Sequence, residues 1–257
     1  MSDLGLVLRQ TSFELRTFRR NVPAAFFTGF FPLMMLVILG SIQVDNTLSE
    51  RSGMAFNQFF VPGIMAYGLI GACFTNIGMR ISLLRDNGIL KRLRGTPLPT
   101  WAYIAGQVLT SVVITLVLST IIVAFGMVFF DVHVYAATLP GVVLAGAIGA
   151  ATFCALGLAI TCAVPNGDAA TPIVQFSLLP LTFISDVFYP DPRDSWTARV
   201  ADWFPVRHLA NAYQHAFTPG VAGPGVRWPD LLVMAAWGLG GVLVTLKWFR
   251  WENKRPN

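Results

Sequence analysis

The chain has 257 residues, of which 54% are hydrophobic and 12% are charged, and its formal net charge is +5. A water-soluble domain carries roughly twice this share of charged residues, and it could not bury so much apolar surface. The composition therefore excludes an ordinary soluble protein and predicts an all-α polytopic membrane protein. It does not indicate a nucleic-acid partner, because the basic residues form short clusters beside apolar segments.

Residues 3–20 form an amphipathic segment. Its large apolar side chains follow one helical stripe, at Leu4, Leu8, Leu15 and Phe18. Its arginines fall mostly elsewhere on the helix, at Arg9, Arg16, Arg19 and Arg20. This pattern predicts a helix in the inner membrane interface, with its apolar side among acyl chains and its cations near anionic headgroups. The alternative is a basic flank that only orients the chain, and both interpretations place the N-terminus inside.

The rest of the chain predicts six spanning helices in a single transmembrane domain that covers residues 1–257. The expected spans lie at about residues 22–44, 57–84, 100–130, 139–164, 169–188 and 229–248. Each is about 20 residues or longer, the length that crosses roughly 30 Å of hydrocarbon. Glycine and alanine in the second and fourth spans permit close helix packing. Pro172 and Pro180 should kink the fifth span, because they remove backbone donors.

The segment between the second and third spans, residues 85–99, reads RDNGILKRLRGTPLP. Asp86 or Asn87 is expected to cap a short helix that Gly95 ends, with Pro97 and Pro99 preventing its resumption. The apolar residues of this helix share one face, at Ile89, Leu90 and Leu93, while Lys91, Arg92 and Arg94 spread over the other. Such a helix can offer an apolar surface to a cytosolic partner. The alternative is an ordinary basic loop that only orients the chain.

The same segment resembles the cytoplasmic coupling loop of ABC-2-type exporter permeases, including the daunorubicin-resistance and nodulation-type subunits. The matching positions are Arg85, Asp86, Gly88, Leu90, Lys91, Arg92, Leu93 and Pro97. Two positions depart from the family pattern, since Asp86 replaces a frequent Glu and Lys91 stands where the family is often acidic. The resemblance implies that this loop docks on a separate ATP-binding subunit through Arg85, Asp86, Gly88, Ile89, Leu90, Lys91, Arg92, Leu93 and Arg94.

Polar and aromatic residues in the second and fifth spans are candidates for a substrate path. They are Asn76, Gln175, Phe176, Thr182, Phe183 and Asp186. Asn76 has an alternative role as a hydrogen-bonding partner of a neighbouring helix. Residues 183–190 resemble the family signature Phe-x-Ser-Gly-x-Phe-x-Pro, with Asp186 in place of the frequent Gly. Its carboxylate could attract a cationic substrate near the outer interface, or it is a solvated or hydrogen-bonded group at a helix end.

Residues 189–228 predict two short amphipathic helices that dip into the outer leaflet and return. This pair resembles the re-entrant outer helices of the same family. His208 and His215 lack companion ligands, so no metal site is expected. Cys73, Cys154 and Cys162 fall inside expected spans without a CxxC pair and are interpreted as small apolar filler.

The distribution of cations predicts the orientation. With the N-terminus, the 85–99 loop and the C-terminus in the cytosol, all but five of the 18 Lys and Arg residues lie inside. The five on the outer side are Arg51, Arg193, Arg199, Arg207 and Arg227. The sequence therefore predicts a multi-pass protein of the cytoplasmic membrane with both termini cytoplasmic.

No phosphate loop of the form Gly-x-x-x-x-Gly-Lys-Ser/Thr and no catalytic or metal-ligand constellation occurs in the sequence. The chain is expected to hold no cofactor and to catalyse nothing itself. The resemblance implies the permease subunit of an exporter for an amphipathic drug or lipid, paired with a second copy or a paralogue. ATP and Mg²⁺ would bind to the separate ATP-binding subunit. The alternatives are export of a glycan or lipid-linked polymer by the same fold, an ion-coupled secondary transporter, and a membrane-embedded enzyme.

Overall fold

The computed structural model describes residues 3–42, 55–95, 99–188 and 195–249, and these residues form helices and turns without a β-strand. Four of the described segments are long and apolar enough to cross a membrane: Phe56–Asp86, Trp101–Phe130, Ala136–Ile160 and Trp228–Trp248. These findings confirm the predicted all-α membrane class. The first expected span contains a shorter apolar stretch, Thr28–Ser41, and the fifth is an 18-residue helix outside that set. The number six therefore stays a prediction.

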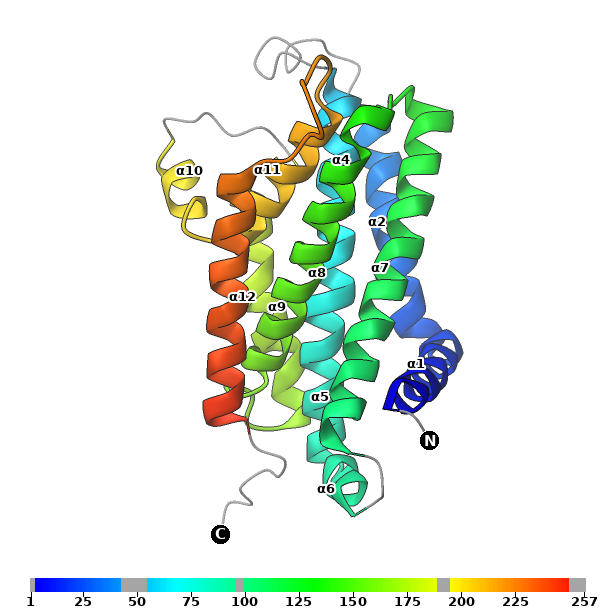
Figure 1. Cartoon of the computed structure of the whole chain (residues 1–257), viewed down its shortest axis with the longest axis vertical. Helices are drawn as coiled ribbons and strands as arrows, with labels where there is room; N and C mark the ends of the chain where they lie inside the picture. Colours follow the sequence, from blue (N-terminus) through cyan, green and yellow to red (C-terminus); the bar gives the residue numbers. More distant parts are fainter. Residues whose placement is uncertain (1–2, 43–54, 96–98, 189–194, 250–257) are drawn as a thin grey trace.

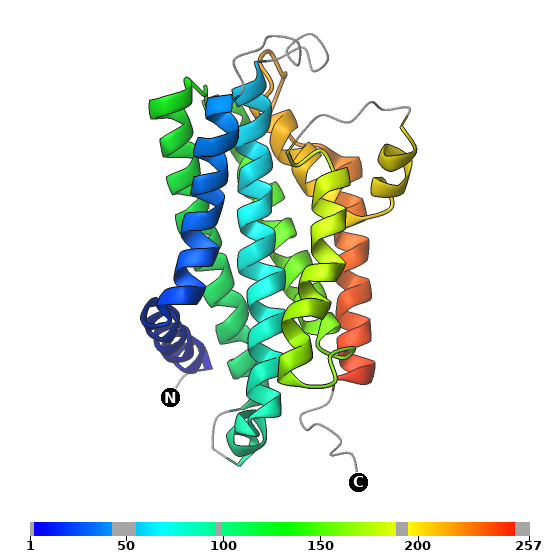
Figure 2. The same ribbon diagram turned by 180° about the vertical axis from the view of Figure 1, so that it is seen from behind.

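The long helices run side by side along the long axis of the molecule, as Figures 1 and 2 show from opposite sides. In chain order the elements are α1 (Asp3–Arg20), α2 (Val22–Ile42), α4 (Phe56–Ile70), the π-helical turn η1 (Gly71–Thr75), α5 (Asn76–Asp86), α6 (Ile89–Arg94), α7 (Thr100–Phe130), the 3-10 turn η2 (Ala136–Thr138), α8 (Leu139–Ile160), α9 (Gly167–Ile184), α10 (Trp196–Ala201), α11 (Pro205–Phe217) and α12 (Trp228–Trp248).

Different helices lie at the two ends of the bundle. Helix α6, the start of α1 and the end of α12 lie at one end, which we call the α6 end (Figure 1). Helices α10 and α11 lie toward the other, which we call the α11 end. Helix α1 lies beside the lower parts of α7 and α2 and packs against both (Figure 1). Helix α11 packs against α4, α8 and α12, so it is an integral part of the fold.

The second expected span forms the centre of the bundle. It is one continuous run of α4, η1 and α5, and 78% of its most apolar stretch is buried, against 28% for the α7 span and 22% for the α12 span. The outer spans therefore expose their apolar side chains, as lipid-facing helices do. The π-helical turn η1 interrupts the central run just before Asn76, and such turns are frequent at functional sites.

Candidate coupling site

The corner between α5 and α6 forms the tip of the α6 end. Helix α5 continues through Asp86, and Gly88 then adopts a left-handed conformation with φ of +67°. Glycine adopts this conformation without a Cβ penalty. The N–H of Gly88 donates to the carbonyl of Arg85 at 3.0 Å, and the N–H of Arg92 donates to the carbonyl of Gly88 at 3.2 Å. Gly88 therefore sets the boundary between the two helices, whereas the sequence indicated Asp86 or Asn87.

Arg85 faces inward from this corner. Its side chain is buried, and Nη1 donates to the carbonyl of Thr161 at 2.9 Å while Nη2 donates to the carbonyl of Val164. Both carbonyls belong to the turn that follows α8, where the helix dipole favours a cation. The carbonyl of Thr161 also accepts from the N–H of Val164 at 3.3 Å. Arg85 therefore joins the α5–α6 corner to the α8–α9 connection. Its buried side chain does not belong to the exposed surface of the corner, and its role in coupling to an ATP-binding subunit stays a prediction.

Leu90 also faces the bundle. It has no exposed surface and belongs to the main apolar core. The expectation that Leu90 forms part of an exposed apolar surface is therefore wrong. The turn at Gly88 orients α6 so that Ile89, with 36% of its surface exposed, faces outward in its place. The side chains of Leu93 and Arg94, and Pro97 altogether, lie outside the described residues.

The exposed residues of the corner make up what we call the α6 surface: Asp86, Asn87, Ile89, Lys91 and Arg92. The α8–α9 connection lies directly beside it, because a Cβ placed on Gly167 would be 3.0 Å from Oδ2 of Asp86. Asn166 begins α9 there by accepting a hydrogen bond from the N–H of Ala169 at 2.9 Å. The corner and the neighbouring connection thus form one continuous surface.

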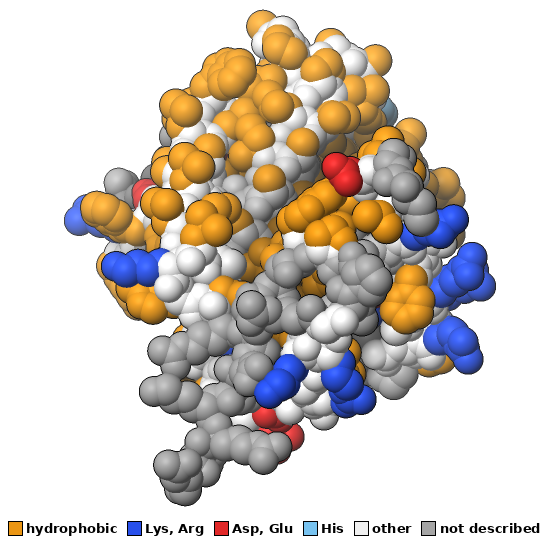
Figure 3. Space-filling model, turned by 60° about the horizontal axis from the view of Figure 1, so that its bottom comes forward, with side chains coloured by type: hydrophobic (Ala, Val, Ile, Leu, Met, Phe, Trp, Pro, Cys, Tyr) orange, Lys and Arg blue, Asp and Glu red, His pale blue; other side chains and the backbone are white. Residues whose placement is uncertain are grey.

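Basic side chains gather around this end of the molecule. Figure 3 looks toward it and shows Lys and Arg around the rim. The exposed cations here are Arg9, Arg16, Arg19 and Arg20 of α1, Lys91 and Arg92 of α6, and Lys247 of α12. Basic residues next to spans favour the cytosolic side of a membrane. The charge pattern thus favours the orientation that the sequence predicts.

A buried ion pair attaches α1 to the central run, and the sequence analysis missed it. Glu14 is buried and pairs with Arg80 of α5. Nε2 of Gln10 also donates to Oε1 of Glu14 at 2.8 Å. Burial raises the pKa of Glu14 above its ordinary value, although Arg80 acts in the opposite direction. The available signal was Arg80 itself, because a cation within a span requires a partner.

The candidate substrate-path residues do not share one surface. Thr182 is buried and donates to the carbonyl of Leu179 at 2.8 Å. Phe176 and Phe183, by contrast, project outward from α9 and are 82% and 71% exposed. Asn76 and Gln175 are half-buried on α5 and α9. Helix α9 therefore has an exposed aromatic side and a mostly apolar buried side, which comprises Ala170, Val174, Leu178 and Thr182.

Asp186 is held inside the fold by an ion pair. Its Oδ2 lies 3.0 Å from Nη2 of Arg207, and both side chains are about nine-tenths buried. Arg207 also donates to the carbonyl of Ala198 at 2.5 Å, and the carbonyl of Asp186 accepts from Gln214 at 2.7 Å. Asp186 has φ of +56°, a conformation that glycine adopts freely and aspartate tolerates. Arg207 also pairs with Oδ1 of Asp202 at 3.3 Å. This arrangement fits the second interpretation of Asp186, a bonded group at a helix end, and does not favour attraction of a cationic substrate.

His208 belongs to a second charged group at the α11 end. Its Nδ1 lies 2.6 Å from Oδ1 of Asp230, and its Nε2 lies 2.9 Å from the carbonyl of Asp202. Arg227 pairs with the other oxygen of Asp230 at 2.8 Å. Burial disfavours the charged imidazole, but the bonds to Asp230 and Asp202 outweigh it and raise the pKa of His208. Among the described residues no group of three or more His, Cys, Asp or Glu side chains could hold a metal ion.

The long apolar helices of the fold define a multi-pass helical membrane protein. The chain belongs to the ABC-2 type transporter family, whose pattern matches residues 7–218. This confirms the family resemblance that the 85–99 loop carried.

Two curated relatives are similar to the chain. The inner membrane transport permease YadH of Escherichia coli K12 is 25% identical over 158 residues, which are 61% of this chain and 60% of YadH. The putative transport permease YvfS of Bacillus subtilis strain 168 is 20% identical over 237 residues, which are 91% of this chain and 93% of YvfS. The chain thus spans about 60% of the length of YadH.

Proposed function

We propose that the chain is the transmembrane permease subunit of an ATP-driven exporter and that the α6 surface docks on a separate ATP-binding subunit. The observation that carries this proposal is the placement of Ile89, Lys91 and Arg92. They are exposed at the basic end of the bundle, on a short helix that continues the central run. ATP and Mg²⁺ would bind to the partner, and the α6 end would face the cytosol.

The geometry supports a mechanical role for this corner. A force on Ile89 would reach α5, because Gly88 is the only residue between α6 and the C-cap of α5 at Asn87. The same force would reach the α8–α9 connection through the bonds of Arg85 to Thr161 and Val164. Helices α5 and α9 would therefore move together. If α5 and α9 together have two discrete arrangements, one would open and the other would close a substrate path through the membrane.

The substrate path would run along the exposed side of α9. Phe176, Leu179 and Phe183 lie about one helical turn apart and are 82%, 41% and 71% exposed. A second copy of the chain, or a paralogous permease, would cover this aromatic side and enclose a path with it. An apolar wall of this kind suits an amphipathic drug or lipid, which would leave the cytosol or the inner leaflet.

Replacing Ile89 with aspartate tests the docking role. We expect at least about a tenfold loss of the copurifying ATP-binding subunit, because a carboxylate at an apolar contact costs about 1.4 kcal/mol or more of binding free energy. ATP-driven export should fall with it. Thermal unfolding in detergent should change much less than the binding, since Ile89 lies at the tip of the bundle with 36% of its surface exposed.

The matched control is Val200→Asp, an exposed β-branched residue on α10 at the other end of the bundle. It should retain the ATP-binding subunit. Equal retention by the Ile89→Asp and Val200→Asp variants would overturn the docking assignment.

A further inference from the structure

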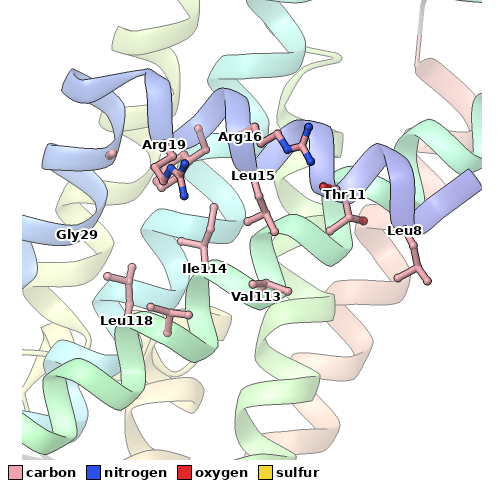
Figure 4. Close-up of a pocket in the computed structure, with 13 residues that line it drawn as sticks. Leu8, Thr11, Leu15, Arg16, Arg19, Gly29, Val113, Ile114 and Leu118 are labelled. Atoms are coloured by element: carbon pink, nitrogen blue, oxygen red, sulfur yellow. The ribbon is translucent and has the colours of Figure 1, made fainter.

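An apolar groove opens between α1, α2 and α7 at the α6 end, with a volume of about 520 Å³. Figure 4 shows Leu15 of α1 pointing toward Ile114 of α7, with Gly29 of α2 at the other side of the groove. This volume falls within the roughly 300–1,000 Å³ of small-molecule sites. The groove is therefore large enough for a discrete ligand.

The groove exists because α1 packs through its polar side. Thr11 and Glu14 are the buried residues of α1, and Thr11 Oγ1 lies 3.5 Å from the carbonyl of Gly106. The N-terminal part of the leucine stripe of α1 is consequently exposed, at Leu4 and Leu8. Leu8 is 52% exposed, and Leu15 is only partly covered where it packs beside Ile114 and Leu118. Apolar surface thus remains uncovered in the groove between α1, α2 and α7.

Two cations border this apolar surface. Arg16 and Arg19 both line the groove, and both are exposed. They are three residues apart on α1, so their side chains leave the same side of the helix. Neither forms an ion pair or hydrogen bond with another described residue, and no acidic residue lines the groove. The site therefore combines an apolar floor with uncompensated positive charge.

We propose that this groove binds one anionic phospholipid. Its acyl chain packs against Leu8, Leu15 and Leu118, and its phosphate bonds to Arg16 and Arg19. Guanidinium groups match phosphate oxygens in charge and geometry. Basic pockets between helices at the cytosolic side of a membrane hold anionic lipid headgroups. A zwitterionic lipid fits less well, because its own cation would lie near the two arginines.

The occupied groove also secures α1. The lipid would fill the space between α1, α2 and α7 that protein side chains leave open, while the Glu14–Arg80 pair holds the other side of α1. A bound lipid therefore stabilises the folded chain against heat. This proposal is independent of any ATP-binding partner.

Native mass spectrometry and thermal unfolding of the purified full chain test the proposal. The probes are phosphatidylglycerol, phosphatidylcholine and inorganic phosphate, each added to the delipidated protein. We expect one phosphatidylglycerol per chain and a rise in the unfolding temperature, with binding at least about tenfold weaker for phosphatidylcholine. Inorganic phosphate should neither stabilise the chain nor displace the lipid, because it lacks an acyl chain.

Two variants separate the headgroup contact from the acyl-chain contact. The double variant Arg16→Gln/Arg19→Gln should weaken phosphatidylglycerol binding at least about tenfold. Gly29→Leu should also weaken it by filling the groove, because a Cβ at Gly29 has room, at 3.5 Å from Leu118, and the added carbons extend into the cavity. This second variant keeps both arginines.

The matched control is Arg20→Gln/Lys247→Gln, which removes two exposed cations from the same end outside the groove. It should bind phosphatidylglycerol like the unmodified chain. Equal losses in the control and in Arg16→Gln/Arg19→Gln would show general surface attraction and overturn the proposal. Unchanged binding by the arginine variant or by Gly29→Leu, or full competition by inorganic phosphate, would overturn it as well.

Discussion

Replacing Arg207 with methionine is expected to destabilise the chain by about 3–5 kcal/mol, the cost of leaving one partner of a buried ion pair uncompensated. The Asp186 carboxylate would keep its burial and lose the guanidinium 3.0 Å away. The carbonyl of Ala198 would also lose one of its two donors and keep the N–H of Asp202. Thermal or denaturant unfolding of the purified protein in detergent measures the effect.

Two further variants identify the cause. Arg199→Met removes an exposed cation from neighbouring α10 and should change stability by no more than about 0.5 kcal/mol. The double variant Arg207→Met/Asp186→Asn removes both charges and keeps a residue that tolerates φ of +56°, so it should be more stable than Arg207→Met alone. A loss no larger for Arg207→Met than for Arg199→Met would contradict the role of this pair.

Replacing Gly63 with alanine should cost about 3 kcal/mol or more, at the upper end of overpacking effects. An added Cβ would lie 2.0 Å from the carbonyl oxygen of Val187, which belongs to the backbone and follows the corner at Asp186. Either α4 or the segment after α9 would have to move. The unfolding midpoint of the detergent-solubilised variant reports this loss.

Gly71→Ala is the matched control, because an added Cβ there would meet no atom of the described residues within 4 Å beyond its own stretch of helix. Alanine is the better helix former, so this variant should be as stable as the unmodified chain or more stable by up to about 1 kcal/mol. A similar midpoint for both variants would contradict the close approach of α4 to Val187.

Composition and the coupling motif predicted the class and the family, because both depend on local properties of the sequence. Apolar runs of spanning length indicate membrane helices whatever their packing. The RDNGILKRL motif is likewise a contiguous stretch. The rotation of each helix about its axis could not be predicted in this way. Leu90 and Ile89 are equally apolar, and only the turn at Gly88 decides which of them faces the core.

The partners of the buried charged side chains could not be predicted from the sequence either. Arg85 reads as one more cytosolic cation, whereas its partners are carbonyl groups 76 and 79 residues away. Backbone carbonyls leave no residue-type signal, so this role was missed. The backbone conformation of Asp186 does have a signal in the sequence. Asp186 stands where the family signature usually has glycine, and a frequent glycine is typical of a positive φ. Its partner Arg207 was predicted only to be one of the five cations on the outer side.

The two charged pairs on α1 and α11 follow a common rule. A charged group inside an apolar bundle requires an opposite charge. Arg80 and Asp186 were both visible as charges within or at the end of expected spans. Their partners, Glu14 and Arg207, come from amphipathic helices that the sequence placed at the membrane surface.

Photo-crosslinking from position 92 tests the central claim most directly. A benzoylphenylalanine in place of the exposed Arg92 on α6 is compared with one in place of Trp203, which is 78% exposed near the α11 end. The account predicts that irradiation of native membranes links position 92, but not position 203, to a chain that carries an ATP-binding domain. Crosslinks to such a chain from position 203 alone, or from neither position, would contradict it.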